Sequence, residues 1–127
     1  FNSTLAKDFK FIRKQGMQLH SKMRFIGSQF NAILNDHLWK RNAQHSNAMA
    51  QKLKAGLSEI KEIQITQSVD ANGVFAVVPT HLIEKLQKEI FFYVWDDKKS
   101  EVRLMCSFDT TKEDIDRLVN KAKSLME

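Results

Sequence analysis

The sequence predicts an α+β fold: a mainly antiparallel sheet of about four strands with helices on one face, in the order ααββαββα. Apolar residues that alternate along the chain indicate strands at 62–67, 73–78, 91–95 and 101–108. The turn-rich segments SVDANG and DDKKS join these strands in pairs, which is typical of antiparallel hairpins. Apolar residues spaced three or four apart indicate helices before, between and after the two pairs.

The N-terminal part of the chain is expected to be helical. Ser3 or Thr4 can cap a short helix that Gly16 ends, so residues 1–24 are interpreted as a connecting helix and linker. A long helix is expected at 25–57. Its apolar stripe consists of Phe30, Ile33, Leu34, Leu38, Met49, Leu53 and Leu57.

Residues 58–127 are expected to form a ββαββα sandwich. Gly56 lies near the end of the long helix, where glycine commonly ends helices. Thr80 begins the helix between the two hairpins. Thr110 and Glu113 have the spacing of a capping box that opens the last helix. The apolar stripe of that helix is Ile115, Leu118, Val119, Ala122 and Leu125.

Length and composition favour one domain with its own core. The chain has 127 residues, of which 43% are hydrophobic. It contains no apolar run near the ~20 residues of a membrane span and no secretory signal, so neither a membrane nor export is expected. A single cysteine cannot form an internal disulfide, which favours a cytoplasmic location. Phe1 stands where an initiator methionine would, which suggests a piece of a longer protein.

The net charge of +5 does not by itself predict nucleic-acid binding. Twenty basic and fifteen acidic residues interleave along most of the chain, as on solvated faces. The densest basic segment, 7–24, is supported by no RNP-like strand, zinc knuckle or helix-turn-helix pattern, so no nucleic acid is expected as a partner. A free-standing basic interaction or RNA-binding module is the alternative, and it would use this segment rather than Arg103.

Other chemistry has little support in the sequence. Cys106 lacks the local signature of a nucleophile and lies on the apolar face of its strand, so an inert buried thiol is expected. His20, His37, His45 and His81 show no metal-ligand spacing, and no metal is expected.

Arg103 is the candidate binding residue that the residues themselves identify. In the strand 101–108, Val102, Leu104, Cys106 and Phe108 alternate with Arg103, so the arginine lies on the face opposite the core. Its planar donors match a carboxylate, which suggests an anion site. The alternative is a solvated arginine on an edge strand.

The face that carries Arg103 is also rich in large apolar groups. Phe91, Tyr93 and Trp95 alternate with Phe92 and Val94, so both faces of this strand are apolar. We expect another domain or subunit to cover the outer face, unless the first helix of the chain does so.

Five segments of the chain carry a resemblance to a known family. They are RKQGMQLHSKMRFIGSQF at 13–30, NAQHSNAMAQKLKAGL at 42–57, NGVFAVVP at 72–79, FYVWDD at 92–97 and EVRLMCSFDTTKEDID at 101–116. In this order the segments resemble the C-terminal part of the threonine aldolase and beta-eliminating lyase family. Those enzymes depend on pyridoxal phosphate and have the aspartate-aminotransferase-like fold.

The resemblance implies that residues 1–127 are the small C-terminal domain of a fold-type-I pyridoxal-phosphate enzyme. It implies that the parent binds pyridoxal 5'-phosphate in an N-terminal large domain that this chain lacks, and that it cleaves a β-hydroxy-α-amino acid to glycine and an aldehyde. The alternative within the family is a β-eliminating amino-acid lyase. The Schiff-base lysine would lie in the missing domain, so this chain alone should bind no cofactor and be inactive.

The resemblance also assigns two arginines. Arg103 matches the small-domain arginine that binds the substrate's α-carboxylate in the family. Arg24 matches a family segment near the active site at a subunit interface; Met23 and Gly27 fit that segment, whereas residues 20–22 replace its glycines. The implied partners are the amino-acid substrate, the chain's own N-terminal domain and further copies of the same chain in a homo-oligomer.

Overall fold

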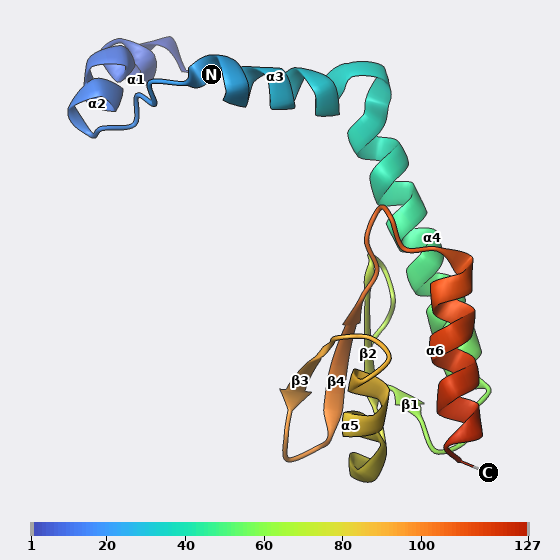
Figure 1. Cartoon of the computed structure of the whole chain (residues 1–127). Coiled ribbons are helices and arrows are strands. Elements are labelled where there is room, and N and C mark those ends of the chain that lie inside the picture. Colours follow the sequence, from blue (N-terminus) through green and yellow to red (C-terminus); the bar gives the residue numbers. More distant parts are fainter. Residues whose placement is uncertain (1, 127) are drawn as a thin grey trace. The chain divides into compact units, whose positions relative to one another are not determined.

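The computed structural model describes residues 2–126. These residues divide into two compact units, and the boundary falls between Leu38 and Trp39. The first unit is helical and the second contains the sheet (Figure 1).

The first unit consists of short helices, and none of its residues between 2 and 38 is buried. The Asn2 side chain accepts a hydrogen bond from the backbone N–H of Thr4 at 2.9 Å, so Asn2 caps the first helix in place of Ser3 or Thr4. The elements are α1 (Ser3–Ala6), α2 (Phe9–Gln15), α3 (Met23–Leu34) and the 3₁₀ turn η1 (Asn35–His37). Because none of their side chains is buried, these helices form no core of their own.

The single helix expected at 25–57 is wrong, because the structure has two helices there. α3 ends before η1, and α4 spans Leu38–Ser58. Asp36 and His37 have φ angles of 49° and 55°, in the left-handed region, which interrupts the helix. Asp tolerates this conformation better than most residues. Apolar spacing continues across the break, from Leu34 to Leu38, and therefore conceals it.

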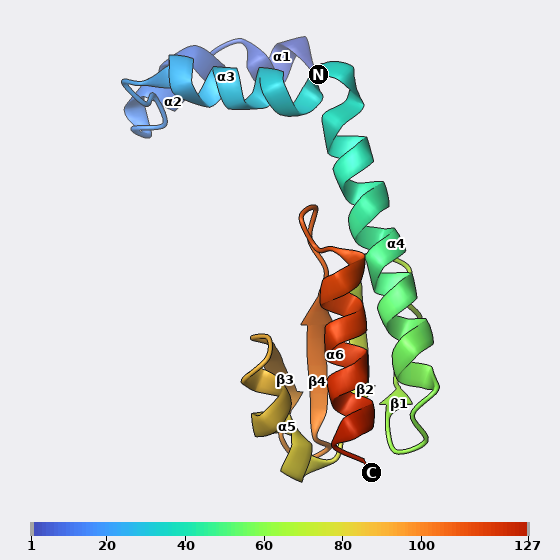
Figure 2. The ribbon, with the colours of Figure 1, turned by 45° about the vertical axis from the view of Figure 1, so that its right-hand side comes forward.

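The second unit is built on a four-stranded sheet in the order β1-β2-β4-β3, with every neighbouring pair antiparallel (Figure 2). The two hairpins predicted from SVDANG and DDKKS are confirmed. Pairing of β2 with β4 joins the hairpins in the middle of the sheet. The strands are β1 (Gln64–Ile65), β2 (Gly73–Val77), β3 (Tyr93–Asp96) and β4 (Glu101–Met105).

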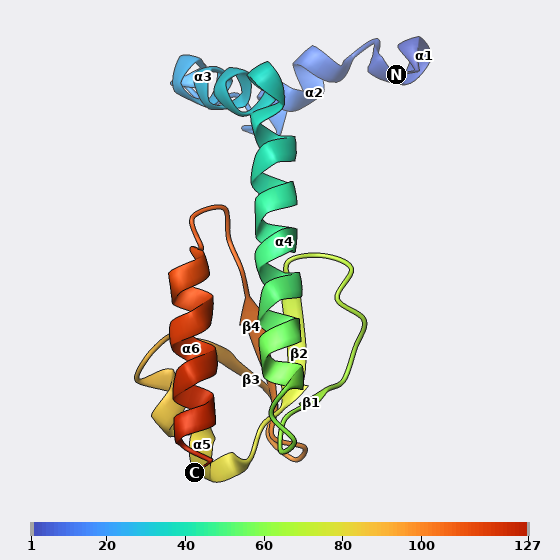
Figure 3. The same ribbon diagram turned by 90° about the vertical axis from the view of Figure 1, so that its right-hand side faces the viewer.

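Helices cover one face of this sheet, as the α+β prediction requires. They are α4, α5 (Thr80–Gln87) and α6 (Lys112–Ser124), and Figure 3 shows α4 and α6 side by side with the strands behind them. Their buried residues join Val74, Ala76, Val102 and Leu104 of the central strands in one core. The helical contribution is Met49, Ala50, Leu53, Leu57, Leu82, Ile83, Leu86, Ile115, Leu118, Val119 and Ala122.

The last strand and helix differ from the prediction at their junction. β4 ends at Met105, so Phe108 is outside the strand and 65% exposed rather than in the core. The capping box of α6 is formed by Thr111 and Asp114, not by Thr110 and Glu113. The Thr110 hydroxyl instead accepts a hydrogen bond from the Ser107 backbone N–H at 2.8 Å, which closes the preceding turn.

Candidate functional site

The sheet face opposite the helices, here called the open face, contains the candidate site. Along β4 the buried Val102 and Leu104 flank Arg103, which is only half-buried. Across the sheet, Phe75 of β2 and Tyr93 of β3 are the pairing partners of Arg103 on its two sides. The alternation expected from the sequence therefore places Arg103 at the middle of the open face.

Two aromatic rings contact the guanidinium of Arg103. Its Cζ lies 5.6 Å from the ring centroid of Tyr93 and 5.1 Å from that of Trp95. Both distances are within the ~6 Å at which a cation is attracted to an aromatic face. Trp95 lies at an irregularity of β3, where the register shifts between Val94 and Asp96, and it has no pairing partner in β4.

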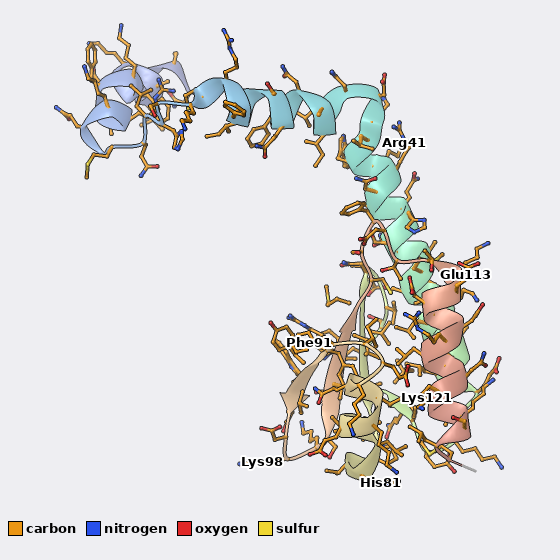
Figure 4. All side chains as sticks on the ribbon, in the orientation of Figure 1. Arg41, His81, Phe91, Lys98, Glu113 and Lys121 are labelled. Atoms are coloured by element: carbon orange, nitrogen blue, oxygen red, sulfur yellow. The ribbon has the colours of Figure 1, made fainter. Side chains whose placement is uncertain are left out.

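Further rings support these two. Phe75 meets Trp95 edge to face at 5.5 Å between centroids, and Phe91 meets Tyr93 in the same way at 5.0 Å. We call Phe75, Tyr93, Trp95 and Phe91 the aromatic row. Figure 4 labels Phe91, just before β3, and Lys98, in the turn that follows this strand. Tyr93, Trp95 and Phe91 are all exposed, so the row is open to solvent in this chain.

Arg103 has no acidic partner among residues 2–126. Its Nε is buried and makes no hydrogen bond. Glu101, two residues away on the same strand, is buried, but its carboxylate accepts a hydrogen bond from the Thr66 hydroxyl. Because no ion pair of the described residues involves Arg103, its positive charge is available to an anion from outside the chain.

Arg24, the second predicted residue, lies in the first unit. It is exposed in the first turn of α3, and its carbonyl accepts a hydrogen bond from the Ser28 hydroxyl at 2.8 Å. The role of Arg24 near an active site or a subunit interface stays a prediction.

Two other side chains that could carry chemistry, Cys106 and His45, are buried or hydrogen-bonded to the backbone. Burial raises the pKa of the Cys106 thiol, which makes it a poor nucleophile. The Nε2 of His45 lies 2.8 Å from the Thr110 carbonyl oxygen. In the part of the chain that the structure describes, no three His, Cys, Asp or Glu residues gather in a way that could hold a metal ion. Nor is any helix between residues 2 and 126 long and apolar enough to cross a bilayer.

The sequence identifies Arg103 but not its contacts with Tyr93 and Trp95. The alternation in 91–95 already placed both rings on one face of their strand. What was missing was the pairing register, which sets Tyr93 opposite Arg103.

Comparison with known proteins agrees with the resemblance. No family model matches the chain. The chain is 33% identical over 126 residues to the low-specificity L-threonine aldolases of Pseudomonas sp. (strain NCIMB 10558) and of Pseudomonas aeruginosa. Each match covers 99% of this chain and 36% of the relative, so the chain spans about a third of the length of the curated relatives it matches.

A solved structure supports the fold. The threonine aldolase of Leishmania major superposes with a TM-score of 0.71 at 28% identity, over 78% of this chain and 30% of that chain. The α+β fold with an open antiparallel sheet is therefore shared with part of this relative.

Proposed function

Because the chain is related to the threonine aldolases over nearly its whole length, we propose that it is the C-terminal small domain of a pyridoxal-phosphate-dependent lyase. The proposed reaction of the parent is cleavage of a β-hydroxy-α-amino acid to glycine and an aldehyde. The chain is 33% identical to two L-threonine aldolases over 99% of its length, which supports the aldolase rather than a β-eliminating lyase. A cytoplasmic homo-oligomer, with Arg24 near a subunit interface, belongs to the same proposal.

The observation that carries the proposal is the unpaired guanidinium of Arg103 on the open face. We assign it to the α-carboxylate of the substrate. No acidic side chain between residues 2 and 126 forms an ion pair with Arg103 and so competes with a substrate carboxylate for the cation. A planar guanidinium binds a carboxylate through two parallel hydrogen bonds, which fixes orientation as well as position.

The contribution of this chain to the reaction is then binding and orientation. When bound in the parent, pyridoxal phosphate supplies an electron sink for cleavage of the bond between Cα and Cβ. We assign the residues that hold it to the N-terminal domain, so the isolated chain is expected to turn over no substrate. Arg103 restrains the carboxylate and therefore limits rotation of the substrate about Cα, which holds the reacting bond in one orientation.

Replacement of Arg103 in the full-length parent tests the proposal. Arg103→Ala should lower kcat/KM. The corresponding loss of transition-state stabilisation should be about 2–4 kcal/mol, as expected for loss of one partner of a desolvated charge pair. The visible absorbance of the bound cofactor should not change. Arg103→Lys should recover only part of the loss, because an ammonium cannot reproduce the two-donor fork.

Arg117→Ala is the matched control. Arg117 is 59% exposed on α6 and pairs with Asp114, so its replacement removes the same charge away from the open face. It should leave kcat/KM near the wild-type value. Wild-type kcat/KM in Arg103→Ala would overturn the assignment and leave Arg103 as a solvated arginine.

A further inference from the structure

We infer that Tyr93 and Trp95 are positioning residues for Arg103, and that they hold its guanidinium so that the terminal Nη nitrogens, rather than Nε, meet an incoming carboxylate. The inference rests on the proposed function of Arg103 and adds two residues and a binding geometry to it. It follows from the contacts of the guanidinium and from the burial of Nε.

Contacts with two aromatic rings restrict the orientation of the Arg103 guanidinium on the open face. Tyr93 is the direct cross-strand partner of Arg103, and its ring centroid lies 5.6 Å from the guanidinium carbon. Trp95, at the irregularity of β3, brings a second ring to 5.1 Å. A bulge of this kind redirects a side chain without ending the strand pairing. The guanidinium therefore lies over two rings of the same strand.

The two rings are themselves supported. Phe75 packs edge to face against Trp95, and Phe91 packs in the same way against Tyr93. Such aromatic contacts prefer a fixed mutual orientation. The rings of Tyr93 and Trp95 consequently keep a fixed orientation beside Arg103, although they are 58% and 56% exposed.

Aromatic rings suit this role better than carboxylates would. An acidic residue that oriented Arg103 would also neutralise it and compete with the substrate for its donors. A ring attracts the cation through its π face and leaves the N–H groups available. The carboxylate of the nearby Glu101 accepts a hydrogen bond from the Thr66 hydroxyl, and no ion pair among residues 2–126 joins Glu101 to Arg103.

Burial of Nε then selects the binding geometry. A guanidinium can offer a carboxylate either Nε with one Nη or the two Nη nitrogens. Of the nitrogens of Arg103, only Nε is both buried and unpaired. A carboxylate cannot reach it unless the side chain moves, so the end of the guanidinium is the accessible fork.

Kinetics of the full-length parent test the positioning role. Tyr93→Leu and Trp95→Leu should each raise KM for the amino-acid substrate by about 3–30-fold, the range expected from loss of one cation–π contact, with kcat changed less. Tyr93→Phe and Trp95→Phe keep a ring and should stay within about threefold of wild type. Phe108→Leu is the control, because this phenylalanine is 65% exposed and has no ring contact with Arg103.

The outcomes separate this inference from the proposed function. If Arg103→Ala leaves kcat/KM unchanged, the proposed function itself fails. If Arg103→Ala is impaired but both leucine variants have the wild-type KM, only the positioning role fails. Equal losses in the leucine and phenylalanine variants would also overturn it, because a ring alone would then not suffice.

Two measurements do not depend on turnover. In the 127-residue chain, the Arg103 Nε–H resonance should show a ring-current shift in NMR spectra that disappears in the Tyr93→Leu/Trp95→Leu double variant. A crystal structure of the parent with bound glycine should place both carboxylate oxygens against the Nη nitrogens. An unshifted resonance would contradict the contact of Tyr93 and Trp95 with the guanidinium. A carboxylate bound to Nε would contradict binding through the Nη nitrogens.

Discussion

Gly56 in α4 faces Val119 in α6 so closely that a Cβ on Gly56 would lie 2.7 Å from Val119 Cγ2. The glycine lies inside α4, which continues to Ser58, and its φ is not positive. Gly56 lies near the end of α4, as the sequence indicates, but it does not itself end the helix. Gly56 allows α4 and α6 to approach each other over the core, because only a residue without a side chain fits against Val119 there.

Gly56→Ala should destabilise the chain. Overpacking costs about 1–3 kcal/mol, whereas the gain in helix propensity from glycine to alanine is only about 1 kcal/mol. In the background of Val119→Ala the clash is removed, and the same change should become stabilising. Urea unfolding of the wild type, the two single variants and the double variant measures this reversal of sign. Equal effects of Gly56→Ala in both backgrounds would contradict the contact.

The cap of α6 predicts a dependence of stability on pH. Hydrogen bonds from the Thr111 hydroxyl and backbone N–H hold the pKa of the Asp114 carboxyl below its ordinary value. The hydrogen bond and charge of Lys123 lower the pKa of Glu59 in the same way. A lowered pKa in the folded state stabilises the fold above the unfolded pKa, and this contribution is lost as the pH falls through the folded value.

Thr111→Ala should therefore have two effects. Loss of the helix cap should reduce the free energy of unfolding by about 1 kcal/mol near neutral pH. The pKa of Asp114 should also rise toward its ordinary value, which NMR titration of the carboxyl carbon measures. Glu59, which directly follows α4, provides the internal control. Its pKa is lowered by Lys123 and not by Thr111, so it should not change in this variant. An unchanged Asp114 pKa in this variant would show that Thr111 is not the cause.

Cys106 should react slowly in the folded chain. Its side chain is 2% exposed, and burial raises the pKa of the thiol, so little thiolate is present near neutral pH. An aromatic disulfide reagent should label it orders of magnitude more slowly than in guanidinium chloride. Labelling at the same rate in both conditions would show that the strand end opens readily.

Amide hydrogen exchange should divide the chain at the unit boundary. None of the described residues of α1, α2 or α3 is buried, whereas α4 carries Met49, Leu53 and Leu57 in the core. Helices without buried apolar contacts open easily. We expect amides in Met23–Leu34 to exchange much faster than the amide of Leu53. Equal protection in α3 and α4 would contradict this division.

The sequence by itself determined the features that depend on local periodicity. A period of two fixed which side chains of 101–105 face the helices, and the two turn segments fixed the hairpins. The stripe of α6 is buried from Ile115 to Ala122 as expected. These features follow from neighbours close in the chain, so they can be predicted without the fold.

The tertiary structure decided the features that depend on distant neighbours. The break at Asp36 and His37 interrupts a regular apolar pattern, and Gly56 takes its meaning from Val119 in another helix. At the candidate site, the sequence placed Arg103 on the open face, but only the pairing of β3 with β4 and the irregularity at Trp95 brought two rings to its guanidinium. Periodicity determines the face of a side chain, whereas register between strands determines what it contacts.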